Sequence, residues 1–451
     1  MIGELNEESG IMGIYNGVNI VRNVSTGLYA LQHRGQESTG IAAANGEKVR
    51  VRKSMGLVAG FVEDGKLDEI AENCIAAIGH VRSSAVSNRT LANAQPMLVT
   101  CKWGFLAVVL NGSITNAGEL RAEMGESGHI FQSNSPAEVI LHEISRTKAD
   151  NLTDAIRTAV KKLKGSFCAL FLTPDSMYIA RDGFGFRPLC MGKKNDSWFF
   201  ASESCAFDLL SVDYVKDIQP GEFLVINKDG IHSEQLLKKN RKAHCIFEFV
   251  YFARPDSRIY EQSADKVRRK MGKKLAEEHP VDADIVIPCP DSSTTAALGY
   301  AQESGIRFEI GLLRNHYLGK TFIDPSQNVR EQRVKLKFNT INGVLKDRRV
   351  CLVDDSIVRG TTLKILCKMI RNAGAKEVHI RVASPPVEHP CNYGMDFPSP
   401  AELIATALAP AEVAKMLGVD SLGYLSVKGM RECTGQPDDF CCACFDDIYP
   451  E

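Results

Sequence analysis

No stretch of the chain approaches the roughly 20 consecutive apolar residues that a membrane-spanning helix needs. The opening residues, MIGELNEESGIMGIYNG, are acidic and lack the basic and apolar regions of a secretory signal. An excess of one charge is also lacking, because 54 Lys plus Arg stand against 55 Asp plus Glu. Internal repeats, low-complexity tracts and long charged tails are absent. We therefore expect a cytoplasmic protein with neither a membrane nor a nucleic-acid partner.

The composition of the 451 residues is that of an ordinary globular protein, with 44% hydrophobic and 24% charged residues. These fractions exclude collagen-like, disordered and coiled-coil classes. At roughly 100–200 residues per domain, the length predicts two or three domains. In a reducing compartment the 14 Cys residues favour metal or thiol chemistry over disulfides.

Two patterns of secondary structure divide the chain. The first half combines short strands with a few helices, which predicts an α+β layered domain; the strands are expected at 104–116, 166–182 and 221–234, and the helices at 136–147 and 152–164. The second half alternates strands with helices, which predicts a parallel sheet; strands are expected at 282–290, 307–314, 348–355 and 376–385, and helices at 293–305 and 361–374. The basic stretch 236–244 indicates a boundary between domains 1–240 and 241–451.

One string, VCLVDDSIVRGTT from Val350 to Thr362, carries the clearest chemical signal. An apolar strand ends in two carboxylates, and a short hydroxyl-rich loop then leads into a helix. Ligands of open α/β sheets bind beyond the carboxyl ends of the strands. A helix N-terminus offers free N–H groups and the positive end of the helix dipole, and Gly360 lets the backbone approach a ligand closely. The string therefore predicts a phosphate-binding site.

The adjacent acids Asp354 and Asp355 need a different role, because like charges repel and a carboxylate is no phosphate ligand. We expect them to hold ribose hydroxyls, either directly or through Mg²⁺, which prefers carboxylate and water ligands. In the alternative interpretation, Asp-Asp-Ser only caps the following helix. The complete strand–loop–helix string favours the binding site.

The same string resembles the phosphoribosyl-diphosphate (PRPP) loop of type I phosphoribosyltransferases. Further strings extend the resemblance from about residue 7 to residue 449 and narrow it to the glutamine PRPP amidotransferase (amidophosphoribosyltransferase) family; they are 252–257, 290–293, 315–322, 325–327, 330–332 and 384–391. The resemblance implies an αββα glutaminase domain of the N-terminal-nucleophile (Ntn) type, joined to a phosphoribosyltransferase domain with a parallel sheet. It also implies the first step of purine synthesis, in which PRPP yields 5-phosphoribosylamine and diphosphate.

The resemblance also implies roles for individual residues. Ser293, Asp354 and Asp355 fall on Mg²⁺ positions. The loop for the 5′-phosphate of PRPP matches Ser356, Ile357, Val358, Arg359, Gly360, Thr361 and Thr362. The basic segment 314–337 matches a mobile loop that closes over PRPP, and Lys320 and Arg330 are expected to bind PRPP from it. Closure would exclude water, so that ammonia captures the reacting carbon; in the alternative, this segment is simply an exposed basic loop.

Four cysteines from three distant segments form a second candidate site, namely Cys245, Cys391, Cys441 and Cys444. Four thiolates suit either an iron–sulfur cluster or zinc. Some branches of the family hold a [4Fe–4S] cluster at the matching positions, so we favour the cluster over zinc. Reduced structural thiols are the third alternative.

The glutaminase half keeps only part of its family pattern. Arg82 matches the residue that binds the glutamine carboxylate, and Asn111 and Gly112 match the oxyanion hole, which stabilises a tetrahedral intermediate. These residues could equally be turn and packing remnants. The nucleophilic Cys is replaced by Ser9, and a hydroxyl needs a well-placed base, which an N-terminal amine can provide only after cleavage behind Glu8. Pro136 stands where an acid would bind the substrate amino group, and Pro supplies neither charge nor donor.

Two further departures lie in the same pocket: Leu110 replaces the usual His, and Ser83–Ala85 replaces Tyr-Ala-Thr.

We therefore predict an amidophosphoribosyltransferase-like enzyme that uses ammonia, from solution or from a separate glutaminase. It is expected to be a homo-oligomer, with purine nucleotides as feedback inhibitors. One alternative is a glutamine-dependent enzyme that uses Ser9, or a Cys-to-Ser variant of such an enzyme. Others are a non-catalytic PRPP-binding regulator and a paralogue with another acceptor.

Overall fold

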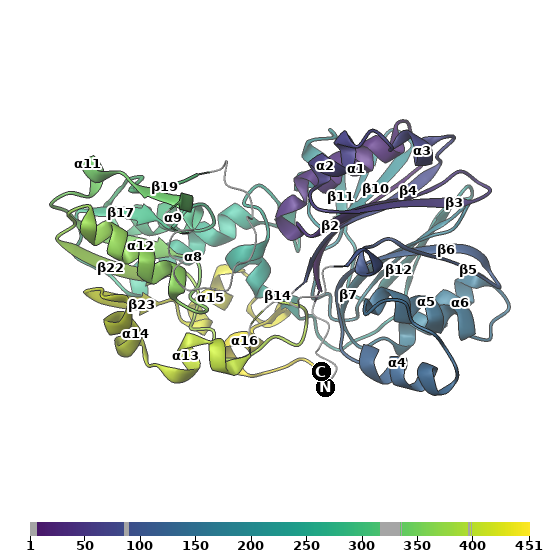
Figure 1. Cartoon of the computed structure of the whole chain (residues 1–451). Helices are drawn as coiled ribbons and strands as arrows, with labels where there is room; N and C mark the ends of the chain where they lie inside the picture. Colours follow the sequence, from purple (N-terminus) through teal and green to yellow (C-terminus); the bar gives the residue numbers. More distant parts are fainter. Residues whose placement is uncertain (1–6, 85–89, 316–333, 335, 396, 398) are drawn as a thin grey trace.

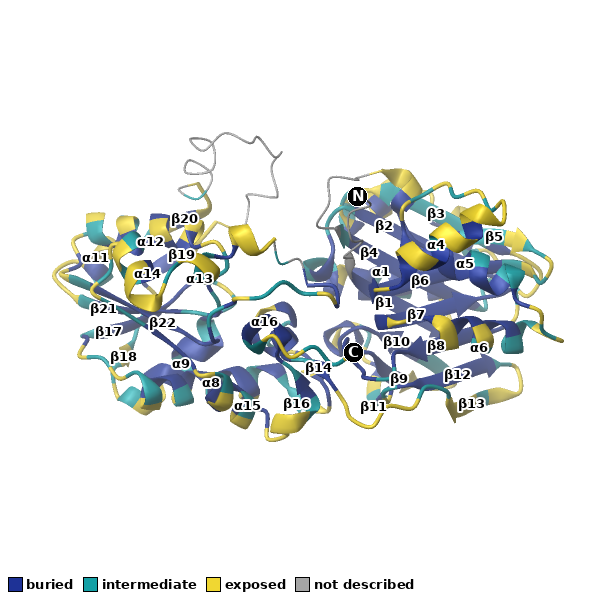
Figure 2. Cartoon of the chain, turned by 90° about the horizontal axis from the view of Figure 1, so that it is seen from below, coloured by how far each residue is buried: buried dark blue, intermediate teal, exposed yellow. Residues whose placement is uncertain are grey.

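The structure is a computed structural model that describes residues 7–84, 90–315, 334, 336–395, 397 and 399–451. Figure 1 shows two halves side by side, with the first half in purple to blue and the second in green to yellow. Both halves are built on sheets whose strands are largely buried (Figure 2). None of the described helices is both long enough and apolar enough to cross a bilayer.

Two stacked antiparallel sheets form the first half. The larger sheet has the order β11-β9-β10-β1-β4-β2-β3, with strands β1 (Glu7–Tyr15), β2 (Ser38–Ala44), β3 (Val49–Met55), β4 (Ala76–Ser84), β9 (Cys190–Lys194), β10 (Ser197–Ala201) and β11 (Asp213–Asp217). The smaller sheet has the order β13-β12-β8-β7-β6-β5, with strands β5 (Met97–Cys101), β6 (Gly104–Ile114), β7 (Gly165–Leu172), β8 (Met177–Arg181), β12 (Glu222–Asn227) and β13 (Gly230–Gln235).

Helices cover the outer face of each sheet, which gives the αββα layers that the resemblance implied. The larger sheet carries α1 (Ile20–Ala30), α2 (Val58–Glu63), α3 (Asp68–Ala71) and α7 (Cys205–Asp208), and the smaller carries α4 (Ala117–Glu126), α5 (Pro136–Arg146) and α6 (Leu152–Lys162). The period-2 alternation of β1 explains the layering. Ile11 packs between the two sheets, whereas Met12 and Ile14 pack under α1. Each sheet therefore buries both of its faces.

The second half is a parallel five-stranded sheet with the order β18-β17-β21-β22-β23. Its strands are β17 (Ile285–Pro288), β18 (Arg307–Phe308), β21 (Arg349–Asp354), β22 (Glu377–Val382) and β23 (Ser421–Tyr424). The helices on one face are α8 (Ala264–Glu278), α9 (Thr294–Ser304) and α15 (Val427–Cys433), and those on the other are α12 (Thr361–Asn372) and α14 (Pro410–Leu417). The predicted alternation of strands and helices is confirmed.

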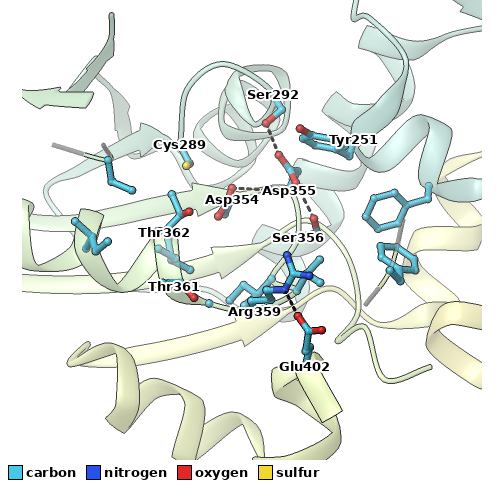
Figure 3. Close-up of a pocket in the computed structure, with 18 of the residues that line it drawn as sticks. Tyr251, Cys289, Ser292, Asp354, Asp355, Ser356, Arg359, Thr361, Thr362 and Glu402 are labelled. Atoms are coloured by element: carbon cyan, nitrogen blue, oxygen red, sulfur yellow. Dashed lines mark hydrogen bonds and ion pairs between the residues drawn. The ribbon is translucent and has the colours of Figure 1, made fainter. Parts of the chain in front are cut away.

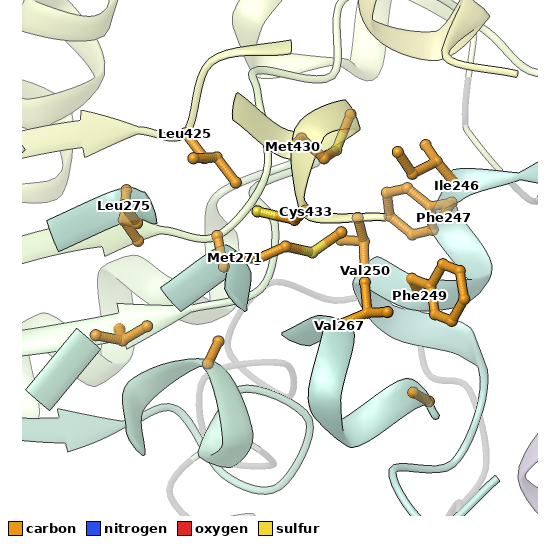
Figure 4. Packing of buried hydrophobic residues seen from close by; sticks show 14 of the residues in the cluster. Ile246, Phe247, Phe249, Val250, Val267, Met271, Leu275, Leu425, Met430 and Cys433 are labelled. Atoms are coloured by element: carbon orange, nitrogen blue, oxygen red, sulfur yellow. The ribbon is translucent and has the colours of Figure 1, made fainter. Parts of the chain in front are cut away.

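Helices α8 and α9, which cover one face of the parallel sheet, pack unusually close to each other. A Cβ on Gly272 of α8 would lie 1.9 Å from the carbonyl oxygen of Ala296 in α9, and one on Gly299 of α9 would lie 2.1 Å from that of Arg269. Only glycine permits the two backbones to approach this far. Met271 and Leu275 of α8 continue the contact toward Met430 of α15 (Figure 4).

The predicted strand at 307–314 is wrong. The structure divides it into β18, which pairs with β17, and β19 (Leu312–Arg314), which pairs with β20 (Phe338–Thr340) in a separate two-stranded sheet. Gly311 lies at the break, where a Cβ would lie 2.8 Å from Leu345 and 2.9 Å from Ile287. This close contact, which no local sequence pattern reveals, lets the chain leave the main sheet.

Candidate active site

The paired acids lie at the carboxyl end of β21, beside the segment that follows its neighbour β17. Ser293 precedes the first turn of α9 and is fully buried, and its hydroxyl donates to Asp354 Oδ1 at 3.0 Å and to Asp355 Oδ2 at 3.4 Å. Ser292 also donates to Asp355, and Ser356 donates to Asp355 Oδ1 at 2.8 Å (Figure 3). Parallel strand ends thus bring together three hydroxyls and two carboxylates from positions about 60 residues apart in the sequence.

Burial raises the pKa of both carboxyls above the ordinary value, and the charge of Asp355 raises that of Asp354 further. The hydroxyls of Ser292 and Ser356 and the guanidinium of Arg268 oppose the shift at Asp355. Two adjacent buried carboxylates resist full ionisation unless a cation joins them. Their chemistry therefore suits a divalent cation, although the described residues contain no group of three or more His, Cys, Asp or Glu side chains arranged to hold a metal.

The loop after the acids passes under an open cavity and ends at α12. Gly360 has a φ of 70°, in the left-handed region, and directly precedes the helix. Thr361 and Thr362 are exposed at the helix N-terminus and line the cavity, where free N–H groups favour an anion. Arg359 points across the mouth and donates to Glu402 at 2.8 Å. The predicted loop residues 356–362 all line this cavity.

The cavity has a volume of about 910 Å³ and a largely aromatic wall, whose Tyr251 lies near Asp355 and Ser292 in Figure 3. Sequence reasoning missed this wall, which consists of Phe247, Tyr251, Phe252, Met395 and Phe397. A one-turn π-helix, Glu248–Phe252, aims two of these rings into the cavity. The motif at 252–257 includes one residue of this wall, Phe252. No spacing in the sequence predicts that it lines the same cavity as Asp354 and Asp355, about 100 positions later.

Most of the predicted lid, including Lys320 and Arg330, lies outside the described residues. Arg314, at its beginning, is described and donates to Asp291 Oδ2 at 2.9 Å. The cationic role of the segment remains a prediction.

Ser9 is enclosed in the middle of the first half. It lies inside β1 opposite Arg82 of β4, and the strand continues back through Glu8 and Glu7, which pair with Ser83 and Ser84. The side chain is fully buried, and its hydroxyl has no hydrogen-bond partner among the described residues. In the uncleaved chain the nitrogen of Ser9 is a peptide N–H within a strand, and it can act as the base that a hydroxyl nucleophile requires only after cleavage behind Glu8.

The other residues predicted for the glutamine site lie in the same half of the protein as Ser9. Arg82 is almost fully buried and forms an ion pair with Glu37 at 3.5 Å. Asn111 on β6 is fully buried, and neither its amide oxygen nor its amide nitrogen has a hydrogen-bond partner in the part of the chain that the structure describes. Gly112 has a φ of 131°, and a Cβ there would lie 2.1 Å from the carbonyl oxygen of Ser166. Pro136 begins α5, which Ser135 caps, so this segment is folded as a helix start.

A buried charge network joins the surroundings of Ser9 to the wall of the cavity. Arg34 donates to the carbonyl oxygen of Ser9 at 3.1 Å and to Glu248 Oε1 at 2.6 Å. Arg187 donates to the same Glu248 oxygen at 3.2 Å and to the Met395 sulfur at 3.6 Å. Glu203 accepts from Arg34 at 2.5 Å. Since Glu248 begins the π-helix of the aromatic wall, these ion pairs fix the cavity against the first half.

The four predicted cysteines gather at the junction of the halves. Cys245 and Cys441 are opposite each other in the parallel pair β14 (His244–Cys245) and β24 (Phe440–Cys441). The Cys444 carbonyl accepts from the backbone N–H of His389 at 3.1 Å, two residues before Cys391. Burial, together with the neighbouring thiols, raises the pKa of Cys245, Cys441 and Cys444 far above that of free cysteine. The backbone N–H groups of Tyr393 and Met395 donate to the Cys391 sulfur at 3.3 and 3.4 Å.

Comparisons with known proteins agree with both halves. The glutamine amidotransferase domain family matches residues 80–208, and the phosphoribosyl transferase domain family matches residues 257–394. Amidophosphoribosyltransferase of Bacillus subtilis is 41% identical over 99% of this chain and 94% of its own length. The Methanocaldococcus jannaschii enzyme of the same name is 43% identical over 98% of this chain and 97% of its own.

Solved structures give the same result. The structure titled as the allosteric regulatory enzyme of purine biosynthesis superposes with a TM-score of 0.93, at 41% identity, over 98% of this chain and 96% of its own. The Bacillus subtilis PRPP amidotransferase complexed with ADP and GMP gives 0.92, at 41% identity, over 98% and 97%. The fold and site define a phosphoribosyltransferase joined to a glutamine-amidotransferase-type domain. The chain belongs to the amidophosphoribosyltransferase family, pentosyltransferases that catalyse the first step of purine biosynthesis.

Proposed function

We propose that this enzyme forms 5-phosphoribosylamine from PRPP and ammonia, without using glutamine. The cavity would hold PRPP, with its 5′-phosphate against residues 356–362 and its ribose near Asp354 and Asp355. Ammonia would attack C1 of the ribose, the bond from C1 to the diphosphate oxygen would break, and the new amine would lose a proton to solvent. No protein nucleophile is needed, because positioning and charge neutralisation lower the barrier.

The observation that carries the ammonia proposal is the position of Ser9. A hydroxyl stands where the family has its nucleophilic thiol, and this hydroxyl is fully buried and has no hydrogen-bond partner, hence no base, among the described residues. Replacement of the acid by Pro136 removes a second requirement for glutamine. The binding remnants Arg82, Asn111 and Gly112 then serve packing alone.

We expect purified enzyme to form diphosphate from PRPP with ammonium chloride and Mg²⁺, and to release glutamate from glutamine at less than about a hundredth of that rate, because an unactivated hydroxyl is a poor nucleophile. The two assays are run side by side. Ser9→Val should leave the ammonia-dependent rate unchanged. Glutamate release comparable to the ammonia reaction, abolished in Ser9→Val, would show instead that Ser9 works as a nucleophile. Mass spectrometry of the mature N-terminus would then reveal a free Ser9 amine.

Mg²⁺ is the metal proposed for the transferase site. Ser293, Asp354 and Asp355 would lie around it, and the buried acid pair has the hard oxygen donors that Mg²⁺ prefers. The ion would neutralise charge on the diphosphate as it leaves. Lys320 and Arg330, from the basic segment 314–337, are proposed to add further positive charge near the diphosphate.

A [4Fe–4S] cluster is proposed for Cys245, Cys391, Cys441 and Cys444, with zinc as the less favoured occupant. The chemistry of the donors suits such a cluster, because four thiols come from three segments and backbone N–H groups already face one sulfur. Among the described residues the four sulfurs are not arranged as a closed metal site, so cluster binding would draw them together. The raised pKa values of Cys245, Cys441 and Cys444 favour the protonated thiols, and a bound metal would favour their thiolates. The cluster would tie the junction together rather than take part in transfer.

Cys441→Ser is expected to lose the bound iron and sulfide of the purified protein and to lower its melting temperature, because one of four ligands is removed. Cys442→Ser is the matched control. Its sulfur accepts from Arg431 at 3.2 Å and lies outside the proposed ligand set. Iron and sulfide analysis with visible absorption distinguishes the variants. Zinc without iron in the wild-type protein would favour the alternative metal.

The remaining proposals concern the setting of the enzyme. We assign residues 1–240 to the glutaminase-like domain and 241–451 to the transferase domain. We further propose a cytoplasmic homo-oligomer that binds neither nucleic acid nor membranes and that purine nucleotides inhibit. The ADP and GMP complex of the Bacillus subtilis relative supports the nucleotide proposal. A separate glutaminase remains a possible source of ammonia.

A further inference from the structure

Two histidines face each other on the surface of the first half, far from the cavity in the second. His129 follows α4 and His142 lies in the middle of α5. Their Nδ1 atoms are 3.0 Å apart, and the rings meet edge to face at 80°. Both side chains are partly exposed. We infer that this pair is a binding site for a divalent transition-metal ion such as Zn²⁺ or Ni²⁺.

The separation of the two nitrogens matches that of adjacent metal ligands. Imidazole nitrogens bind such ions at about 2.0–2.1 Å, which places two neighbouring ligands about 3 Å apart when they subtend roughly a right angle. Imidazole is also the side chain that Zn²⁺, Ni²⁺ and Cu²⁺ favour. Because the described residues offer no third His, Cys, Asp or Glu ligand, water would complete the coordination.

The proton positions are already nearly those that metal binding needs. Glu138 lies 3.9 Å from Nε2 of His142, so it favours a proton on that nitrogen and a lone pair on Nδ1. The carboxylate lies beyond hydrogen-bond distance of the ring, so it acts on His142 through its charge alone. Without metal, His129 must donate its Nδ1 proton to His142; with metal, that proton moves to Nε2 of His129. Neither ring loses its net neutrality.

The surroundings hold both rings in place. The backbone N–H groups of Gln132 and Ser133 donate to Glu138 at 2.7 and 2.8 Å, and Phe131 packs against His142 at 4.6 Å. The backbone N–H of His129 is bonded to the last turn of α4, whose negative dipole end favours a cation. Arg121 opposes the cation, but its guanidinium lies over the Phe131 ring at 4.1 Å and is bonded to the Ser133 carbonyl.

A bound ion would fasten residues 127–135 onto α5. This segment leads to Ser135, whose hydroxyl accepts from Gln95 at 3.4 Å, and Gln95 in turn accepts from the N–H of Leu110 next to Asn111. The site would therefore stabilise the region from which the glutamine-binding acid has been lost. It is independent of the transferase reaction.

Calorimetric titration with Ni²⁺ tests the inference on the full chain. Wild-type protein is compared with His129→Gln, His142→Gln and the control His232→Gln, which removes an exposed histidine on β13. We expect both pair variants to lose one equivalent of Ni²⁺ binding or to bind it at least tenfold more weakly, and the control to match the wild type. Ni²⁺ binding at the cysteines or acids is common to all four proteins and cancels.

Hydrogen exchange of residues 127–135 provides a second measurement. Ni²⁺ should slow exchange there in the wild type and the control, but not in His129→Gln. Equal Ni²⁺ affinity and stoichiometry in all four proteins would overturn the inference and leave only an N–H···N hydrogen bond. Unchanged exchange in the wild type at saturating Ni²⁺ would overturn it as well.

Discussion

Asp354→Asn is expected to lower the ammonia-dependent rate of PRPP consumption by at least about a hundredfold, equivalent to about 2.7 kcal/mol of transition-state stabilisation. The carboxylate is one of two that face the proposed Mg²⁺ and the ribose, and a neutral amide neither binds the ion nor balances its charge. The measurement is diphosphate release at saturating PRPP and ammonia. Asp282→Asn is the matched control, because Asp282 lies on the surface in an ion pair with Arg349.

The stability of Asp354→Asn separates a catalytic effect from misfolding. Because burial and Asp355 raise the pKa of Asp354 to about 7, ionising it costs folding free energy, and that cost grows from about pH 4 to about pH 7 and is constant above. The isosteric amide avoids the cost, so the melting temperature should stay the same or increase. A variant that kept more than a third of the wild-type rate would contradict the role of Asp354.

Glu248→Gln is expected to lower the free energy of unfolding by about 3–5 kcal/mol, the range found when one partner of a buried ion pair is removed. Glu248 is fully buried and accepts from Arg34 at 2.6 and 3.0 Å and from Arg187 at 3.2 Å. The neutral amide would face two buried guanidinium groups. Urea unfolding measures the difference.

Glu234→Gln serves as the comparison for this change. Glu234 pairs with Arg157 at the surface, where the Arg157 side chain is 34% exposed and the Glu234 side chain 41%. Exposed pairs contribute at most about 1 kcal/mol, so the midpoint of unfolding should hardly move. If Glu248→Gln were no more destabilised than Glu234→Gln, the network would not be what fastens the cavity wall to the first half.

The transferase site was largely predictable because its signal is local. Strand β21, the two acids, the loop and the start of α12 follow one another within 13 residues. Parallel strands also align their carboxyl ends, which explains why Ser293, assigned to the same metal from the family resemblance, lies beside the acids in the structure. The family resemblance supplied the identity of the ligand, which the geometry of hydroxyls and carboxylates by itself does not specify.

The aromatic wall could not be predicted, since it depends on how the two halves meet. Tyr251 and Phe252 face the cavity only because Glu248, at the start of their π-helix, is held by Arg34 from the other half. The sequence likewise led to the prediction that Ser9 replaces the nucleophile, but it did not show the complete burial of the Ser9 hydroxyl. The burial follows from the stacking of the two sheets, because Ser9 lies on the same face of β1 as Ile11, which packs between them.

The short pair of β14 and β24 has a consequence for dissecting the protein. The edge of β14 is also bonded to the first half, since the N–H groups of Ala243 and Cys245 donate to the carbonyls of Phe184 and Phe186 at 2.9 and 3.0 Å. If the gene were split near codon 240, the N–H groups of Ala243 and Cys245 would lose their acceptors. The split would also expose Phe184 and Phe186, which pack against Ala243 and Tyr393. Fragments produced separately should aggregate, whereas co-produced fragments should reassemble.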